Sequence, residues 1–367
     1  MINVAIVGCG RIAKRHAELL TQHVAGMRLV AVCDHHAGRA EAFGARHGVP
    51  AFESLAEMLA MRGIDLVAVL TPSGEHAEHA IAAMRSGRHV LVEKPMALTL
   101  TDADAMLDES ERAGVQLFVV KQNRFNVPVV RAREALEAGR FGQLVLGTVR
   151  VRWCREAAYY DEAAWRGTWA LDGGVLANQA SHHVDMLRWF MGPVASVHAR
   201  GATALARIEA EDTAVATLRF RNGALGVIEA TTAARPHDME GSLSVLGSTG
   251  AVEIAGFAVN QTRIWQFNEP LPGDADALTR FSVNPPNVYG FGHQAFYEHV
   301  VEVLGGRAAP LVDGHEGRGT LELLVALYES MASGEEVALP VQGVRHSRLG
   351  RRASVPASAW AAWEAAS

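Results

Sequence analysis

The chain has few cysteines, and they are scattered. Cys9, Cys33 and Cys154 form no C-x-x-C pair and no spacing typical of metal ligands. Cys9 and Cys33 also lie in apolar, strand-like contexts. We therefore expect a reducing, cytoplasmic compartment, and we predict no metal site.

Long hydrophobic runs and an excess of basic residues are also missing. No apolar run reaches the ~20 residues that span a bilayer, and residue 3 already lies in a predicted strand, so neither a signal peptide nor a membrane anchor is expected. A net charge of -6 argues against a nucleic-acid partner. A local cluster of arginines would still allow an anionic small molecule. The 367 residues, 49% hydrophobic and 20% charged, fit roughly two soluble domains.

The first motif is a glycine turn between a strand and a helix. The apolar run from Ile2 to Val7 meets Gly8-Cys-Gly10-Arg-Ile-Ala13, and residues 14–20 fit a helix. In such a unit the first glycine allows the tight turn, and the second lets a pyrophosphate approach the backbone. The free N–H groups of the following helix then face the phosphates. The pattern predicts a dinucleotide-binding site.

The end of the next predicted strand supports this interpretation. The strand predicted over residues 28–33 ends at Asp34, which lies ~20 residues downstream, where a carboxylate bonds the ribose 2′-hydroxyl. A carboxylate there repels a 2′-phosphate, which favours NAD over NADP. The alternative is a turn residue that simply ends the strand. Further strands at 65–70, 89–92 and 116–120 alternate with helices, which predicts a parallel, doubly wound sheet and a first domain over residues 1–120.

A lysine follows one of these strands directly. The strand 89–92 ends in Glu93-Lys94-Pro95, where proline favours an extended backbone at Lys94. Ligands bind at the carboxyl edge of an open α/β sheet, and a lysine there can lose its proton through desolvation. Lys94 is therefore a candidate acid-base group for a hydroxyl. The alternative is a surface lysine at a strand end.

The rest of the chain, residues 121–367, has a different pattern of apolar and polar residues. Residues 143–153 alternate apolar and polar, as do several later segments, and Asn222-Gly223 is a hairpin signal. We predict an α+β domain with a large, mostly antiparallel sheet whose interior face is covered by helices. The candidate covering helices are residues 127–138, 174–191 and 291–304.

The helix predicted over 174–191 carries a second chemical signal. Asn178, His182 and Asp185 fall at i, i+4 and i+7, on one stripe. Histidine can take a hydroxyl proton near neutral pH, and an adjacent acid or amide can fix its tautomer. The alternative for His182 is a hydrogen-bonded, partly buried histidine. His183 is expected to be exposed.

Arginines and aromatic residues gather between the sheet and that helix. Arg155, Tyr160 and Arg166 lie on a predicted long loop, where ligand contacts are common. Arginine pairs well with phosphates and carboxylates. Arg150 and Arg152 share one face of a strand, so for them a solvated or subunit-facing role is expected.

Taken together, the glycine turn, Glu93-Lys94-Pro95 and the His182-x-x-Asp185 helix resemble the Gfo/Idh/MocA oxidoreductases over nearly the whole chain. Within that family the chain resembles the WlbA-type UDP-N-acetylglucosaminuronate 3-dehydrogenases. The segments that carry this resemblance are residues 119–124, 159–161, 165–169, 172–174, 178–182, 211–213 and 289–293.

The resemblance implies that Lys94 and His182 are catalytic. Many relatives have an aspartate where this chain has Asn178, which weakens an inositol-type interpretation. The cofactor contacts that it implies are Gly8, Gly10, Arg11, Ile12, Asp34, Thr71, Pro72, Glu93 and Lys94. The substrate contacts expected for this chain are Lys94, Arg155, Tyr160, Arg166, Asn178, Gln179 and His182.

The implied activity is NAD-dependent oxidation of the C3 hydroxyl of a UDP-linked N-acetylaminosugar uronate, in the biosynthesis of cell-surface polysaccharide sugars. Two alternatives stay open: an inositol or free-sugar dehydrogenase, and a non-catalytic NAD-sensing regulator on the same fold. The resemblance further implies a cofactor that stays bound and is reoxidised by 2-oxoglutarate, and a homo-oligomer, either dimer or tetramer.

Overall fold

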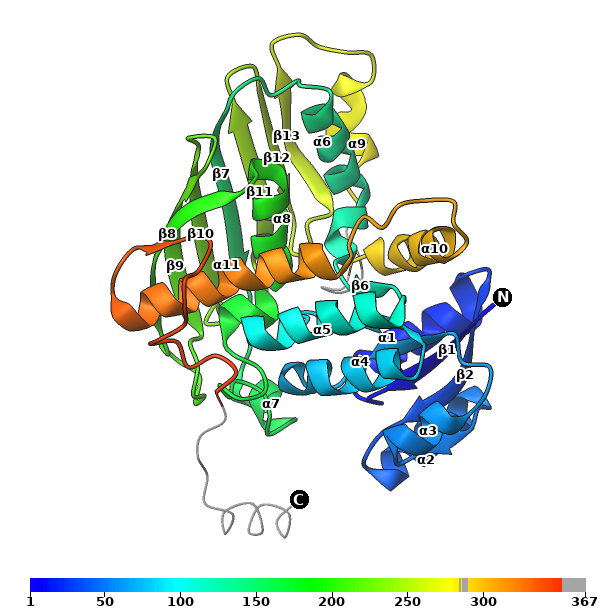
Figure 1. The fold of residues 1–367 in the computed structure, drawn as a ribbon. Helices are drawn as coiled ribbons and strands as arrows, with labels where there is room; N and C mark the ends of the chain where they lie inside the picture. Colours follow the sequence, from blue (N-terminus) through cyan, green and yellow to red (C-terminus); the bar gives the residue numbers. More distant parts are fainter. Residues whose placement is uncertain (284, 286–289, 352–367) are drawn as a thin grey trace.

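A computed structural model describes residues 1–283, 285 and 290–351 of the chain (Figure 1). Tyr289, in one of the family-like segments, and the Ala/Ser-rich end from 353 to 367 lie outside the described residues. Within the described ranges, no helix combines the length and the apolar character needed to cross a bilayer.

The first part of the chain forms a parallel sheet. Its strands lie in the order β3-β2-β1-β4-β5-β6. The strands are β1 (Ile2–Val7), β2 (Met27–Cys33), β3 (Ala51–Phe52), β4 (Leu66–Val69), β5 (His89–Val92) and β6 (Leu117–Val119). The strand order reverses between β1 and β4, which opens a crevice at the carboxyl ends of the strands. The predicted doubly wound sheet is confirmed.

Helices alternate with these strands, as the sequence pattern predicts. They are α1 (Ala13–Glu18), which continues as a π-helical turn at Leu19–His23, α2 (Ala37–His47), α3 (Leu55–Ala60), a 3-10 turn at Ser73–Glu75, α4 (His76–Arg85) and α5 (Leu100–Ala113). Alternate side chains along each strand point to opposite faces. Val67 and Val90 therefore pack on the side of α4 and α5, while Ile6 and Phe118 pack on the side of α1.

The second sheet is large and mostly antiparallel. Its order is β13-β12-β11-β7-β10-β9-β8-β14, and the pair of β7 with β10 is parallel. The strands are β7 (Leu144–Arg152), β8 (Val194–Ala202), β9 (Thr213–Phe220), β10 (Leu225–Thr231), β11 (Glu240–Gly247), β12 (Gly250–Ala255), β13 (Gln261–Phe267) and β14 (Val337–Ala338). Burial alternates along β9, so one face of this sheet is covered and the other is open. This confirms the predicted fold class.

Helices cover the inner face of this sheet. α8 (Ser181–Met191) packs on β7 and β11, and α11 (Gly314–Ser333) lies between β8 and α5 (Figure 1). Gly147 on β7 allows the close approach of α8, because a Cβ there would lie 2.5 Å from the Cγ of Met191. The helix predicted over 174–191 is not continuous: Val175–Gln179 forms a π-helical turn, and α8 starts only after Ala180.

One predicted covering helix lies elsewhere. α10 (Gly292–Leu304) buries Phe296, Tyr297 and Val300 against the face of the first sheet that also holds Leu19 and Phe118. The prediction that residues 291–304 cover the second sheet was therefore wrong. Periodicity reveals that a helix has an apolar face, but not which of two sheets that face covers.

A 3-10 turn at Gln122–Phe125 and α6 (Val127–Glu137) connect the two sheets. Arg124, on this turn, is fully buried and donates two 2.8 Å hydrogen bonds to Asp185 on α8 and one to Glu316 on α11. Thr320 adds a 2.7 Å hydrogen bond to Asp185. The junction is thereby fixed to both helices. The remaining elements are α7 (Ala157–Asp161), α9 (Ala277–Arg280) and a 3-10 turn at Asp274–Asp276.

Candidate active site

A cavity of about 2250 Å³ lies at the carboxyl edge of the parallel sheet. Its wall on that side includes the turn after β1, Asp34, the residues after β4 and the end of β5. The other wall is the long segment between β7 and α8, which contains α7. The cavity brings together most of the residues that the sequence singles out, among them Lys94 and His182.

The glycine turn is shaped to receive phosphates. Gly8 has a φ of 92°, and a Cβ there would lie 2.8 Å from the carbonyl carbon and oxygen of Leu70. Only glycine fits such a position. A Cβ on Gly10 would instead meet open space, so a ligand can approach the backbone there. Arg11, Ile12, Thr71 and Pro72 line the same part of the cavity.

Asp34 is fixed at the end of β2. It is 4% exposed, and its carboxylate accepts the backbone N–H of Cys9 at 2.9 Å and that of His36 at 3.0 Å. Arg39 lies 3.3 Å from the same carboxylate. The negative charge therefore stands at a defined place on the cavity wall, where it suits a ribose diol.

Glu93 ties the end of β5 to two helices. Its carboxylate accepts the N–H of Lys94 at 3.0 Å and lies 3.1 Å from Nε2 of His16, whose Nδ1 lies 2.6 Å from the hydroxyl of Tyr297. Burial alone would raise the pKa of Glu93, but the hydrogen bond and charge of His16 lower this pKa to about 2. In the described part of the chain, the ligand atoms of His16, Glu93 and His293 lie within 4.8 Å of one another. Because both ring nitrogens of His16 already have partners, this cluster is better explained as a hydrogen-bond network than as a metal site.

Lys94 reaches from β5 to the turn before α8. Its Nζ donates a 2.6 Å hydrogen bond to the main-chain carbonyl of Asn178. Burial lowers the pKa of Lys94, although the charges of Glu93 and Asp172 oppose this effect. A partly buried amine with a lowered pKa is suited to exchanging a proton with a hydroxyl.

His182 lies at the start of α8 and is 7% exposed. Burial, together with the charges of Lys94 and Lys121, lowers its pKa well below 6.5, so the ring is neutral near pH 7. Nε2 of His182 lies 3.0 Å from the side-chain nitrogen of Gln122. An amide N–H in this position makes Nε2 the acceptor and leaves the ring proton on Nδ1, so Nε2 can take a hydroxyl proton once the hydroxyl replaces Gln122 as its partner.

Sequence reasoning missed this role of Gln122, and it also missed Asp172. Asn178 donates its side-chain N–H to Asp172, which also accepts the N–H of Gly167 at 2.7 Å. Burial raises the pKa of Asp172 to about 6 in spite of these bonds. The loop thus supplies a carboxyl group next to the amide at position 178. The only sequence signal was an Asp-Gly-Gly turn before the helix.

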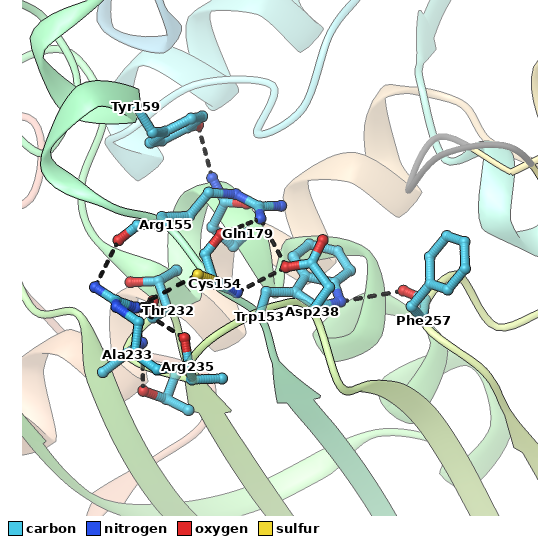
Figure 2. Close-up of polar contacts among 12 residues, drawn as sticks. Trp153, Cys154, Arg155, Tyr159, Gln179, Thr232, Ala233, Arg235, Asp238 and Phe257 are labelled. Atoms are coloured by element: carbon cyan, nitrogen blue, oxygen red, sulfur yellow. Dashed lines mark hydrogen bonds and ion pairs between the residues drawn. The ribbon is translucent and has the colours of Figure 1, made fainter.

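The loop arginines line the cavity, but each of them has an acidic partner. Arg155 donates a 2.9 Å hydrogen bond to Asp238, as Figure 2 shows. Arg166 donates one of 2.8 Å to Glu162. Tyr159 accepts a 2.8 Å hydrogen bond from the side-chain nitrogen of Gln179 (Figure 2). Both residues line the cavity.

Two other predicted groups lie away from the cavity. Tyr160 is not among the described residues that line it, since its hydroxyl lies 2.9 Å from Thr232. Arg150 and Arg152 form ion pairs on the large sheet, with Glu240 at 3.2 Å and Glu229 at 2.6 Å respectively.

Two features of α8 differ from the sequence prediction. His183 is fully buried, with its ring centroid 5.7 Å from that of Trp153, so the prediction that it is exposed was wrong. Asp185 shares its stripe with His182 but is bound by Arg124 and Thr320. α8 is covered on both sides, so its polar residues need partners inside the protein.

Comparison with known families matches two models to the chain. One is described as "Oxidoreductase family, NAD-binding Rossmann fold" and covers residues 2–121. The other is described as "Oxidoreductase family, C-terminal alpha/beta domain" and covers residues 133–339.

The chain is also similar to individual proteins. A WlbA dehydrogenase from Bordetella pertussis, solved with NADH and UDP-GlcNAcA, is 44% identical over 93% of this chain and 99% of that one, with a TM-score of 0.86. A WlbA dehydrogenase from Chromobacterium violaceum, with the same ligands, is 41% identical over 93% and 97%, with a TM-score of 0.87. A scyllo-inositol 2-dehydrogenase from Bacillus subtilis is 26% identical over 93% of this chain and 97% of that protein. The bound NADH of the two WlbA dehydrogenases and the NAD-binding family model agree with the cradle at Gly8, Gly10 and Asp34: the cofactor is NAD.

Proposed function

The chain belongs to the Gfo/Idh/MocA oxidoreductase family and is an NAD-dependent dehydrogenase of sugar-type alcohols, and we propose that it oxidises the C3 hydroxyl of a UDP-linked N-acetylaminosugar uronate. The observation that carries the proposal is the single cavity that joins the NAD cradle to Lys94, His182 and Arg155. The identity of 41–44% to two dehydrogenases that bind NADH and UDP-GlcNAcA supports this choice of substrate.

In the proposed reaction, the protein takes up the hydroxyl proton and positions the sugar. Bound NAD supplies the hydride acceptor. Lys94 or His182 removes the proton of the C3 hydroxyl, since Lys94 is partly buried, His182 is buried, and the pKa of each is lowered. The hydrogen bond from Lys94 to Asn178 O and that from Gln122 to His182 orient the two groups before substrate arrives.

The uronate carboxylate needs a cation near the reaction centre, and Arg155 is the best-placed candidate. Its charge acts on the pKa values of both Lys94 and Tyr159. Arg166 contacts Tyr159 and Glu162 in the same loop and is the second candidate. If Arg155 holds the carboxylate, Arg155→Ala will raise the KM for the uronate. The factor should correspond to the loss of ~1.5 to 3 kcal/mol, the free energy of a charge-assisted hydrogen bond. Weak turnover of UDP-N-acetylglucosamine, which has no carboxylate, will change little.

A uniform loss for both nucleotide sugars would instead assign Arg155 to another part of the substrate. Arg150→Ala is the matched control, because Arg150 is paired with Glu240 on the large sheet and does not line the cavity within the described residues. If Arg155→Ala and Arg166→Ala both left KM unchanged, neither arginine would bind a substrate anion.

The second candidate function is oxidation of inositol or a free sugar. The similarity to a scyllo-inositol 2-dehydrogenase supports it. The amide at Asn178 disfavours this function, because inositol dehydrogenases of the family are expected to have an aspartate at this position. A non-catalytic NAD-sensing regulator is disfavoured by the presence of both Lys94 and His182 in the cavity.

The proposal extends to the setting of the reaction. The protein would act in the cytoplasm on a precursor of a cell-surface polysaccharide, and 2-oxoglutarate would reoxidise the bound NADH. A dimer or tetramer would form through the open face of the large sheet, where Val145, Val215 and Val227 are exposed. Light scattering on the purified protein tests the assembly, and nicotinamide absorbance of protein purified without ligand tests cofactor retention.

The decisive experiment compares substrates. Purified protein with NAD and 2-oxoglutarate is mixed with UDP-N-acetylglucosaminuronate, myo-inositol or glucose. The proposal expects a 3-keto nucleotide sugar, identified by mass spectrometry, from the first compound only. Turnover of inositol or glucose without turnover of the nucleotide sugar would establish the second candidate.

A further inference from the structure

The end of the described chain forms a segment that crosses the cavity side of the protein. We call residues 339–351 the C-terminal strap. The family model for the second domain ends at residue 339, the first residue of the strap, so residues 340–351 lie beyond the match. It starts after β14, at the edge of the large sheet, and runs back to the loop that contains Trp169.

The strap is held by specific bonds rather than by loose surface contact. The carboxylate of Glu329 on α11 accepts the backbone N–H groups of Arg345, His346 and Ser347 at 2.8 to 3.1 Å. Leu349 is 4% exposed and packs against Gly173, and the N–H of Gly350 donates a 2.8 Å hydrogen bond to the carbonyl of Trp169. Residues on both sides of position 348 are thus anchored.

This anchoring places Arg348 at the cavity. Arg348 and Arg351 both line it, and the guanidinium of Arg348 lies 5.4 Å from the ring centroid of Trp169. The side chain of Arg348 is exposed, and it forms no ion pair or hydrogen bond with any described residue. Arg351 donates to the carbonyl of Arg345 instead.

Four other arginines of the cavity differ in this respect, and Arg351, which also has no acidic partner among the described residues, donates to backbone carbonyls. Arg11 and Arg166 share Glu162, Arg39 is paired with Asp34, and Arg155 is paired with Asp238. Among the described cavity residues, Arg348 is therefore a cation whose charge no acidic side chain neutralises. A diphosphate attracts such a group strongly, because arginine matches phosphate oxygens in charge and geometry.

We propose that Arg348, presented by the C-terminal strap, binds the diphosphate of the nucleotide-linked substrate. This inference rests on the proposed function. Lys94 is partly buried and His182 is buried, and both mark the reacting end of the substrate, whereas the exposed Arg348 suits a group farther from the reacting carbon. A nucleotide-linked uronate carries at least three negative charges to a protein of net charge -6, so an unneutralised cation that lines the cavity favours its binding.

The test uses UDP, which carries the diphosphate but no sugar. Calorimetric titration of the NAD-bound protein with UDP should give a Kd at least tenfold higher for Arg348→Ala than for the parent, the loss expected of one charge-assisted contact. Arg348→Lys should recover part of the affinity. Arg345→Ala is the matched control, because it removes the same charge from the same strap at a residue that does not line the cavity within the described chain. Its UDP affinity should equal that of the parent.

Kinetics then separates the inference from the proposed function. With UDP-N-acetylglucosaminuronate, Arg348→Ala should raise KM and leave kcat near the parent value. An unchanged UDP affinity in Arg348→Ala would overturn the inference, even if the parent oxidises the uronate. A parent that binds UDP through Arg348 but does not oxidise the uronate would refute the proposed substrate and leave the diphosphate site standing. Equal losses in Arg345→Ala and Arg348→Ala would also overturn the inference, since they would indicate only the general charge of the strap.

Discussion

The side-chain nitrogen Nζ of Lys94 lies 2.6 Å from the main-chain carbonyl oxygen of Asn178. One hydrogen bond thus joins the end of β5 to the turn that precedes α8. It holds the lysine in place through a neutral acceptor, which stabilises the protonated amine less than a carboxylate would. When a substrate hydroxyl arrives, the same amine can exchange partners without moving far.

Removal of either proposed acid-base group should therefore slow the chemical step. We expect Lys94→Met and His182→Phe each to lower kcat by ~10²-fold or more, with NAD affinity little changed. If the two groups form one relay, the double variant will be little slower than the slower single variant, because groups that act as a unit are not additive. Steady-state kinetics and NADH fluorescence titration measure both quantities. Near-parental turnover of His182→Phe would leave His182 a structural role only.

Gln122 should control the pH dependence through His182. The pKa of His182 lies well below 6.5 because of burial and the nearby Lys94 and Lys121. Gln122→Glu places a carboxylate near Nε2, which favours the protonated ring and raises that pKa. The acid limb of the profile of kcat against pH should then move to higher pH, so activity at pH 6 falls more than activity at pH 8. An unchanged profile would contradict the assigned contact; Gln116→Glu, at an exposed position, is the control.

Asp34 should set the preference for NAD over NADP. Its carboxylate repels a 2′-phosphate, while Arg39 lies only 3.3 Å from it. Asp34→Ser removes the repulsion and leaves Arg39 free to face the phosphate. The ratio of the dissociation constant of NADP to that of NAD should therefore decrease. Adding Arg39→Ala should reverse much of the gain in NADP affinity. Equal affinities for NAD and NADP in the parent protein would remove the basis for this role of Asp34.

Glu211 should make stability fall as the pH rises. Burial raises its pKa to about 7, although the N–H of Leu176 and the hydroxyl of Tyr328 donate to it. Between the ordinary glutamate pKa of 4.5 and about 7, the folded protein keeps a proton that the unfolded chain has lost, so the free energy of unfolding decreases with rising pH. Glu211→Gln removes this titration. The free energy of unfolding of the variant minus that of the parent should therefore increase by about 2 to 3 kcal/mol between pH 4.5 and pH 8. Urea unfolding at both pH values measures the difference, and parallel pH profiles for the two proteins would refute it.

Arg124 should matter more for stability than any surface arginine. Arg124→Met leaves the carboxylate of Asp185 buried with its main cation removed, which typically costs about 3 to 5 kcal/mol. Arg131→Met, which breaks the exposed pair with Glu134, should cost no more than about 1 kcal/mol. Chemical denaturation of both variants gives the comparison. Similar losses for the two would show that the buried network is not a major contributor.

Local patterns were enough to predict the fold class. The turn around Gly8, the carboxylate of Asp34 and the strand before Lys94 each depend on residues adjacent in sequence, and the structure brings all three to one cavity. Alternation of apolar residues likewise predicts the large sheet, because its inner face is covered and its outer face is open.

Contacts between distant residues were not predictable in this way. Gln122 and His182 are 60 residues apart, and no periodicity links an amide on a turn with a histidine on a helix. Arg348 meets Trp169 across a still longer stretch of chain. The burial of His183 depends on how the helices and the sheet pack around α8. The periodicity of a single helix carries no information about these neighbours.

The position of α10 has a consequence for how the protein is made. The N-terminal sheet is synthesised first, yet one of its faces is covered by Phe296, Tyr297 and Val300, which are synthesised nearly two hundred residues after β6. Until the ribosome has released that helix, the apolar side chains around Phe118 and the buried His16 lack their final cover. A nascent chain of the first 120 residues should therefore bind a chaperone that recognises exposed apolar surface, and the dinucleotide cradle should reach its stable form only when synthesis is almost complete.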